Sequence, residues 1–164
     1  MPGPDHVDHI LEQWAATRPD VDVSPMAVIG RLSRVCRLVD DRLGRTFAAH
    51  GLDRASFDVL ATLRRSGGVL TPGELTRSAM VTSGAITQRL DRLEERGLVT
   101  RARNAQDGRG VHVRLTDGGR TLVDAALPDH VATEQDLLAA LTDTQRAALT
   151  DALRTLLAAL GDGR

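Results

Sequence analysis

The sequence predicts a mainly helical fold with one small β-hairpin, and three observations support this. Apolar residues recur at helical spacing over most of the 164-residue chain. Alternating, strand-like residues occur only in two short runs, 98–103 and 111–115. The aromatic residues are limited to two Phe and one Trp, so the core must be built from aliphatic side chains, which suits packed helices. A chain of this length has room for one compact domain, with or without flanking arms.

Five helices are predicted before the hairpin. Their approximate ranges are 6–18, 25–50, 54–65, 72–80 and 84–96. Short polar residues, proline and glycine stand at the ends of these ranges, where helices begin and stop. The caps and stops are Ser24-Pro25, Gly51, Asp53, Gly67-Gly68, the capping box Thr71-Pro72-Gly73-Glu74, and Gly97.

Two further helices are predicted after the hairpin. Thr116 caps the first, which runs toward Leu141 and which Pro128 is expected to bend or interrupt. Thr142 and Gln145 form a capping box that opens the last helix. The apolar positions of that last helix are Leu149, Leu153, Leu156, Leu157 and Leu160.

Positive charge is concentrated around the hairpin. The formal net charge of the chain is −1, and all 21 basic residues are Arg. Residues 82–120 contain eight Arg and five acidic residues, a local net charge of +3 that leaves −4 for the rest. Guanidinium groups bind phosphate oxygens and guanine edges well, so this segment is the predicted contact with nucleic acid.

A short helix, a tight turn, a second helix and a two-stranded hairpin follow one another in the order of a winged helix-turn-helix. The second helix begins with small polar residues, whereas Ile86, Leu90 and Leu93 form an apolar face on its other side. A slim first turn can approach base edges in the major groove, so we predict that this helix reads double-stranded DNA. The predicted DNA-binding residues are Ser83, Gly84, Thr87, Gln88, Arg92, Arg103 and, at the wing tip, Arg109.

These residues resemble the MarR family of bacterial regulators. The resemblance is most specific in Ser83-Gly84-Ala85-Ile86-Thr87-Gln88-Arg89-Leu90-Asp91-Arg92-Leu93-Glu94-Glu95-Arg96-Gly97-Leu98-Val99, the wing Asp107-Gly108-Arg109-Gly110 and the exit Leu115-Thr116-Asp117-Gly118-Gly119-Arg120. It implies a fold that is mainly α with a small β wing, in which N- and C-terminal helices form a dimerisation region. The expected division is 1–52 for the N-terminal helices, 53–116 for the DNA-binding domain and 117–164 for the C-terminal dimerisation helices. It further implies a homodimer, usually a repressor, on a palindromic operator.

The helix before Pro25 resembles an extension found in the branch of this family that responds to urate and related small organic anions. The matching ligand-binding positions are Trp14, Asp58, Arg89 and Arg101. The resemblance implies that Asp58 lies near Arg101, and that an anion entering there acts on the recognition helix through Arg89. Other members of this branch prefer tricarboxylates such as citrate or trans-aconitate, so the ligand is either urate or another purine, or a tricarboxylate.

Other classes of function receive little support from the sequence. No nucleophile elbow, phosphate-binding glycine loop or paired-carboxylate motif is present, so we predict that the protein is not an enzyme and needs no cofactor. His6 and His9 have a spacing compatible with metal binding but no third ligand, so no metal site is predicted. The alternative from another class is a winged-helix interaction adaptor that does not bind DNA.

The remaining expectations concern compartment and redox chemistry. The N-terminus lacks a secretion signal and no run reaches the length of a membrane span, so we predict a cytoplasmic protein with no membrane partner. Cys36 is the single cysteine and cannot form an internal disulfide. It lies on an apolar stripe, where it is either a packing residue or, through an intersubunit disulfide, a redox sensor.

Overall fold

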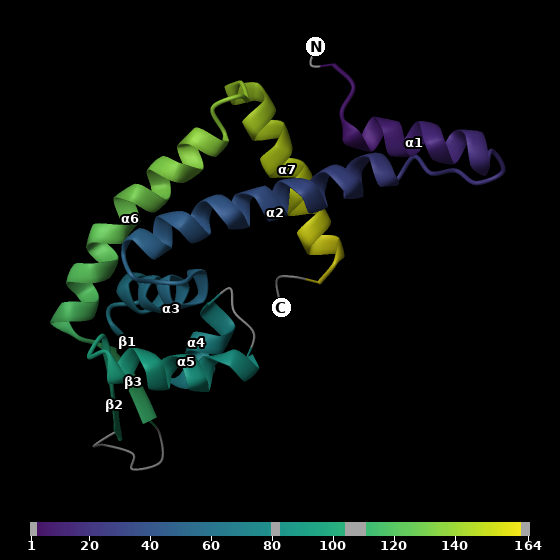
Figure 1. The fold of residues 1–164 in the computed structure, drawn as a ribbon. Coiled ribbons are helices and arrows are strands. Elements are labelled where there is room, and N and C mark those ends of the chain that lie inside the picture. The colour runs from purple at the N-terminus through teal and green to yellow at the C-terminus, as the bar shows by residue number, and fades with distance from the viewer. Residues whose placement is uncertain (1–2, 80–82, 104–110, 162–164) are drawn as a thin grey trace. The chain divides into compact units, whose positions relative to one another are not determined.

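The computed structural model describes residues 3–79, 83–103 and 111–161, and within them it is mainly helical, as predicted (Figure 1). The elements are α1 (His6–Thr17), α2 (Met26–Ala49), α3 (Arg54–Arg65), β1 (Val69–Leu70), α4 (Pro72–Ser78), α5 (Ser83–Glu95), β2 (Val99–Arg103), β3 (Val111–Leu115), α6 (Asp117–Leu137) and α7 (Asp143–Ala159). The chain divides into two compact units, Met1–Arg42 and Leu43–Arg164. None of the helices in the described residues combines the length and the apolar character that crossing a bilayer requires.

The first unit consists of α1 and most of α2, up to Arg42, and α1 lies beside the beginning of α2 (Figure 1). Val7 is buried, and a Cβ added at Gly30 would lie 3.3 Å from its Cγ1 atom, so the two helices approach closely at this glycine. At the same end, the Arg31 guanidinium pairs with Asp5 at 2.9 Å and with Asp8 at 2.6 Å. An aliphatic contact and an ion-pair cluster therefore hold α1 against α2.

The predicted helix signals are confirmed at most positions. The side chains of the predicted caps accept backbone N–H groups as expected at Asp53 for α3, Thr71 with Glu74 for α4, Thr116 for α6, and Thr142 with Gln145 for α7. Gly67 and Gly97 have φ values of +82° and +67°, the left-handed conformation that ends a helix and that glycine adopts without a Cβ clash. These local signals therefore set most of the element boundaries.

Two helices differ from the sequence prediction in one detail each. Helix α2 begins at Met26, so Pro25 precedes the helix instead of occupying its first position. Helix α6 runs without interruption through Pro128. Its buried residues Val123 and Ala126 precede the proline, and α6 packs against α3, so tertiary contacts keep the helix uninterrupted at a proline that was predicted to bend or interrupt it.

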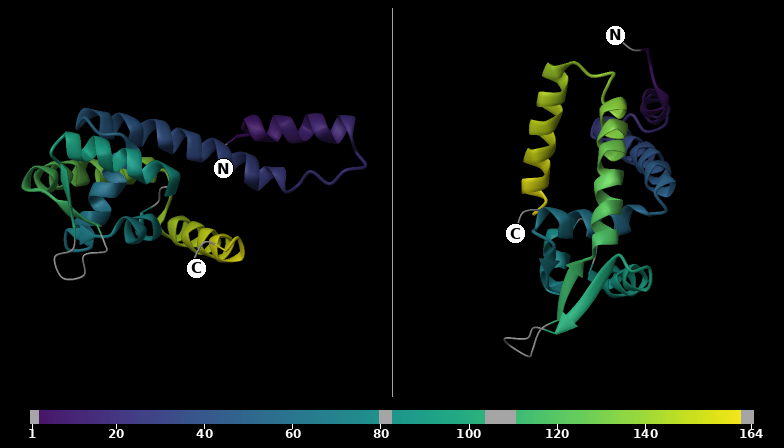
Figure 2. Two further views of the ribbon diagram at one scale, coloured as in Figure 1. Left: turned by 90° about the horizontal axis from the view of Figure 1, so that it is seen from below. Right: turned by 90° about the vertical axis from the view of Figure 1, so that its left-hand side faces the viewer.

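The sheet has one more strand than the sequence predicted. Its order is β1-β3-β2, and both pairs are antiparallel. In the predicted hairpin, Val99 pairs with Leu115 and Arg103 with Val111. The added strand β1 contains only Val69 and Leu70, too few residues to show an alternating pattern, and it exists because β3 offers it a free edge. Figure 2 shows β2 and β3 side by side, extending away from the helices of this unit.

The core of the second unit joins the helices to the sheet. Its largest fully buried side chains are Phe47, Leu60, Leu63, Leu75, Leu90, Leu93, Val59, Val99, Val113, Val123 and Thr62. The ring of Phe47 stacks on that of Phe57, with centroids 4.5 Å apart, and His130 lies against both rings. Helices α3, α5 and α6 thus share one aliphatic core that supports the surface of α5.

Thr62 is the one polar member of this set, and it supports a stability prediction. It is fully buried, and its Oγ1 atom has no hydrogen-bond partner among the described residues. We expect Thr62→Val, which keeps the shape and removes the hydroxyl, to raise the free energy of unfolding by about 1 kcal/mol. Thr62→Ser, which keeps the hydroxyl and removes the methyl group, should lower it by a similar amount. Urea unfolding midpoints measure both, and a lower midpoint for Thr62→Val would contradict the prediction.

Candidate nucleic-acid interface

Helix α5 has one buried and one exposed face, and the exposed face is polar. Its buried side chains are Ile86, Leu90 and Leu93, each at most 2% exposed. Thr87, Gln88 and Arg92 are exposed to solvent. Hydroxyl and amide groups can bond to base edges, and guanidinium can bond to bases or phosphates. The aliphatic core therefore directs a row of hydroxyl, amide and guanidinium groups outward, and their contacts with nucleic acid remain predictions.

The other predicted DNA-binding residues are described only in part. Ser83 and Gly84 form the first turn of α5 and Arg103 ends β2, but the side chains of Ser83 and Arg103 lie outside what the structure describes. Arg109 lies outside the described residues altogether. Their contacts with DNA remain predictions.

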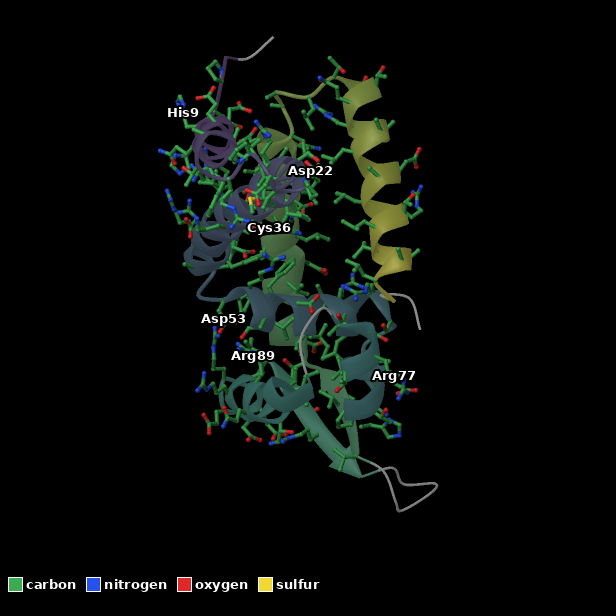
Figure 3. The ribbon with its side chains drawn as sticks, turned by 90° about the vertical axis from the view of Figure 1, so that its right-hand side faces the viewer. His9, Asp22, Cys36, Asp53, Arg77 and Arg89 are labelled. Atoms are coloured by element: carbon green, nitrogen blue, oxygen red, sulfur yellow. The ribbon has the colours of Figure 1, made fainter. Side chains whose placement is uncertain are left out.

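Arg89 is anchored on the inner side of α5. Its Nη1 atom donates to both carboxylate oxygens of Asp53, at 2.5 and 2.6 Å, and to Ser56 Oγ at 3.1 Å. Figure 3 shows Asp53 and Arg89 next to each other. The same Asp53 carboxylate caps α3 by accepting the Ser56 N–H at 2.7 Å. One carboxylate thus joins the start of α3 to the middle of α5.

Arg101 joins α5 to the wing. Its backbone N–H and its Nε each donate to Glu94 at 2.8 Å, and its Nη2 pairs with Asp91 at 2.7 Å. The side-chain hydrogen bond from Arg101, together with its backbone N–H, holds the pKa of Glu94 below its usual range. Glu94 and Asp91 in turn raise the pKa of Arg101. The pair is therefore fully charged at neutral pH.

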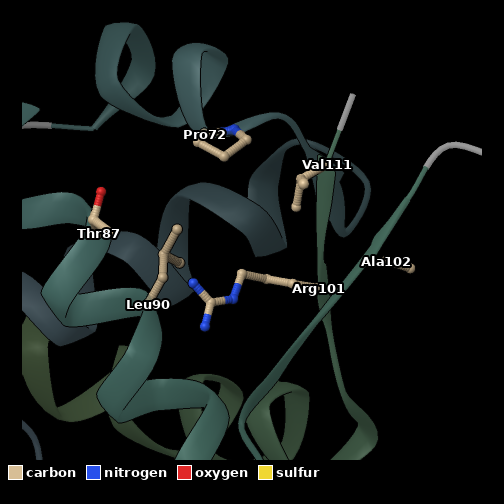
Figure 4. Close-up of a pocket in the computed structure, with 6 residues that line it drawn as sticks. All are labelled: Pro72, Thr87, Leu90, Arg101, Ala102 and Val111. Atoms are coloured by element: carbon tan, nitrogen blue, oxygen red, sulfur yellow. The ribbon is translucent and has the colours of Figure 1, made fainter. Parts of the chain in front are cut away.

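A cavity of about 350 Å³ lies between α4, α5 and the wing strands (Figure 4). It is lined by Pro72, Thr87, Leu90, Arg101, Ala102 and Val111. Arg101 extends from β2 toward α5 across this space. The cavity is mainly apolar, with one hydroxyl and one guanidinium group as its polar side-chain groups.

Asp58 lines a different cavity. That cavity of about 290 Å³ also touches Phe47, Phe57, His130 and Glu134. The carboxylates that pair with Arg101 are those of Asp91 and Glu94, whereas the resemblance implied Asp58. Within the second unit, the predicted ligand residues Asp58, Arg89 and Arg101 therefore have separate surroundings.

The first unit contains the fourth predicted ligand residue. Trp14 on α1 is 42% exposed, so within this unit it is not a core side chain. Cys36 is a free, exposed thiol on α2. Among the described residues, no group of three or more His, Cys, Asp or Glu side chains is arranged to hold a metal ion.

Sequence reasoning missed the carboxylates that hold the two arginines. Asp53 was predicted only as a cap, because nothing local indicates that residue 89 folds back onto it. The helical pattern of α5 likewise does not indicate which cation Asp91 and Glu94 bind. Their bond to Arg101, seven residues beyond Glu94, depends on the tight turn at Gly97 that brings β2 back along the helix.

The order of α4, α5 and a β wing over a shared core defines a winged helix-turn-helix protein. A family model described as MarR family matches residues 50–110. The transcriptional regulator PecS of Dickeya dadantii is 39% identical over 142 residues, which are 85% of this chain and 86% of PecS. A mutant MarR of Escherichia coli complexed with operator DNA is 31% identical, with a TM-score of 0.72 over 83% of this chain and 96% of that one.

A third relative is BpsR of Bordetella bronchiseptica, in a structure that concerns regulation of its DNA binding by 6-hydroxynicotinic acid. It is 25% identical, with a TM-score of 0.72 over 79% of this chain and 91% of that one. The chain belongs to the MarR family. It is therefore a DNA-binding transcriptional regulator and not an enzyme, as the sequence predicts.

Proposed function

We propose that this protein is a dimeric repressor that binds a palindromic operator and is released from it by a small organic anion such as urate. The observation that carries the proposal is the outer face of α5, where Thr87, Gln88 and Arg92 are exposed above a fully buried aliphatic face. The mutant MarR of E. coli was crystallised in complex with operator DNA, which supports operator binding by this relative. An interaction adaptor would favour an apolar or acidic face here.

In this proposal, polar side chains of α5 contact base edges, and arginine side chains contact the DNA backbone or the minor groove. Thr87 and Gln88, with Ser83 and Gly84 in the slim first turn, approach base edges in the major groove. The guanidinium groups of the recognition helix and the wing bind phosphates or the minor groove and set the register. Those of Arg92, Arg103 and Arg109 are the candidates.

Dimerisation is supported by apolar faces that the single chain leaves exposed. Helix α7 has no buried residue at all. Within the second unit, the exposed large apolar residues of α6, α7 and their C-caps are Leu127, Val131, Leu138, Leu149, Leu153, Leu156, Leu157 and Leu160. In the first unit, those of α2 are Met26, Val28, Ile29, Val35 and Leu38. Unpartnered apolar faces of this kind, taken separately in each unit, are typical of protein interfaces, and a second copy covers them in the proposed dimer. On this basis we keep the proposed division into 1–52, 53–116 and 117–164, whereas the compact units of the single chain divide between Arg42 and Leu43.

The proposed ligand is an anion because two of the four candidate residues are arginines with partly buried side chains, 18% exposed for Arg89 and 30% for Arg101. Partly buried guanidinium groups bind carboxylates and similar oxygens strongly. An exposed aromatic face such as Trp14 suits a planar heterocycle, which favours urate or another purine over citrate or trans-aconitate. The regulation of BpsR by 6-hydroxynicotinic acid is consistent with a planar heterocyclic effector.

The experiment selects the preferred duplex from a random pool and then measures release. We expect a palindrome whose half-sites lie about 10 base pairs apart, because a two-fold dimer places its recognition helices one helical turn apart. Fluorescence anisotropy of the labelled duplex should then report release by urate, with citrate as the comparison. No preferred duplex would refute DNA recognition. Unchanged affinity in millimolar urate and citrate would refute the ligand class alone.

A further inference from the structure

Asp53 has two bonding roles, and only one of them is needed to start a helix. Its Oδ1 accepts the Ser56 N–H at 2.7 Å, which caps α3. An asparagine or serine at this position would cap equally well. The negative charge is instead used by Arg89, which approaches both carboxylate oxygens (Figure 3).

The pair is buried unevenly. The Arg89 side chain is 18% exposed, and its Nε is buried without a hydrogen-bond partner among the described residues. The Asp53 side chain is 58% exposed. Removing the carboxylate would therefore leave a largely desolvated cation, whereas Asp53 could turn into water at little cost. Arg89 depends on an anion at this place more than Asp53 depends on the arginine.

The pair also persists over a wide pH range. Burial disfavours the charged form of Asp53, but the hydrogen bond from Ser56 and the Arg89 guanidinium outweigh it and lower the Asp53 pKa below its ordinary value of 3.8. The carboxylate is therefore charged at every pH above that value. The stabilisation that the Asp53–Arg89 ion pair gives the folded protein is lost only as the pH falls through the lowered pKa of Asp53.

We propose that Asp53 is an internal competitor of the anionic effector: it occupies the Arg89 guanidinium in the ligand-free protein, and a bound anion must displace it. The inference rests on the proposed function, because it concerns the same arginine. While the pair is intact, Asp53 ties α5 to the first turn of α3. Once an effector oxygen replaces the carboxylate, Asp53 still caps α3, but α5 loses this tie.

Two consequences follow from this arrangement. The intact pair favours the orientation of α5 that binds operator, so the effector and DNA oppose each other through one ion pair. The effector must also bring a full negative charge, because a neutral ligand would leave the largely buried guanidinium without a counter-ion. Asp53 is thus a positioning residue that sets both the resting affinity for DNA and the sensitivity to the effector.

The test begins without any effector. Operator affinity is measured by anisotropy at fixed salt for the full-length wild type, Asp53→Asn, Arg89→Gln and the double variant. Because asparagine keeps the cap, α3 should remain folded, which far-UV circular dichroism checks. We expect Asp53→Asn to lower operator affinity about 5- to 10-fold. The double variant should bind operator no more weakly than Arg89→Gln, because both substitutions remove the same ion pair.

A matched control accounts for the change in net charge. Asp124 pairs with Arg64 through a similar ion pair from α6 to α3, and Asp124→Asn removes the same charge away from α5. Its operator affinity should equal that of the wild type or slightly exceed it. The inference would be overturned if Asp53→Asn raised operator affinity as well. It would also be overturned if the effects of Asp53→Asn and Arg89→Gln simply added in the double variant.

The second arm measures release by urate and by citrate. We expect Asp53→Asn to be released at an effector concentration about 10-fold lower than the wild type, because the competing carboxylate is gone. An unchanged half-release concentration would overturn the competition. If neither probe releases even the wild type, the ligand class of the proposed function fails. The operator affinities of the single and double variants, measured without effector, then decide alone whether Asp53 holds Arg89.

Discussion

Replacing Thr87 and Gln88 together with alanine is expected to lower affinity of the dimer for the selected operator about 1,000-fold, while affinity for unrelated duplex DNA changes little. Each well-made contact to a base edge discriminates by about 1–3 kcal/mol, and two are removed per chain. Both side chains are exposed on α5 and alanine favours helix, so the fold should be unaffected. Anisotropy titrations with the operator and with a shuffled duplex of equal length measure the two affinities.

Arg92→Ala is the control for this experiment. Arg92 is exposed on the same helix, and a residue that binds phosphate should weaken both duplexes alike. It should also reduce the slope of log affinity against log salt by about one per chain, which the Thr87 and Gln88 variant should not. If that variant lost affinity equally for operator and shuffled DNA, the assignment of α5 to base reading would be wrong.

The largest expected effect on stability is that of Gly119→Ala. A Cβ at this position would overlap the backbone carbonyl oxygen of Leu98, and it would lie 3.0 Å from Leu115 Cδ1. The Leu98 oxygen cannot easily retreat, because it accepts hydrogen bonds from both the backbone N–H and the hydroxyl of Thr116. We expect a loss of about 3 kcal/mol in unfolding free energy, at the upper end for overpacking. In thermal unfolding this is roughly 6 to 12 °C.

The neighbouring glycine provides the comparison. A Cβ at Gly118 would lie 3.7 Å from Thr116 Oγ1 and 3.8 Å from the Gly97 oxygen, which are ordinary contact distances. Gly118→Ala should therefore leave stability unchanged or raise it by up to about 1 kcal/mol, since alanine favours helix. Equal melting temperatures for the two variants would show that the approach of α6 to Leu98 is not tight.

Local signals in the sequence were sufficient for most of the fold. Asp53, Thr71 and Thr116 begin helices as predicted, and Gly97 ends α5, because a cap needs only groups within about four residues of itself. The polar outer face of α5 could be predicted for a similar reason: helical periodicity alone separates its buried leucines from Thr87 and Gln88.

Other features depended on residues far apart in the chain. The two-residue strand β1 forms only because β3 passes beside it, and α6 continues through Pro128 because it packs on α3. The family resemblance predicts that Arg89 belongs to a ligand site, but it does not predict the carboxylate 36 residues earlier that holds this side chain.

The sequence by itself determined where the helices begin and end, and which face of α5 meets solvent, because these depend on neighbours within a turn or two. The tertiary structure alone decided which carboxylate neutralises each partly buried guanidinium. The pairing of Arg89 with Asp53, and of Arg101 with Asp91 and Glu94, follows from how close the folded backbone brings them. A guanidinium that is removed from water needs a carboxylate beside it, so each arginine pairs with the carboxylate that the fold brings closest. The periodicity of the sequence does not reveal which carboxylate that is.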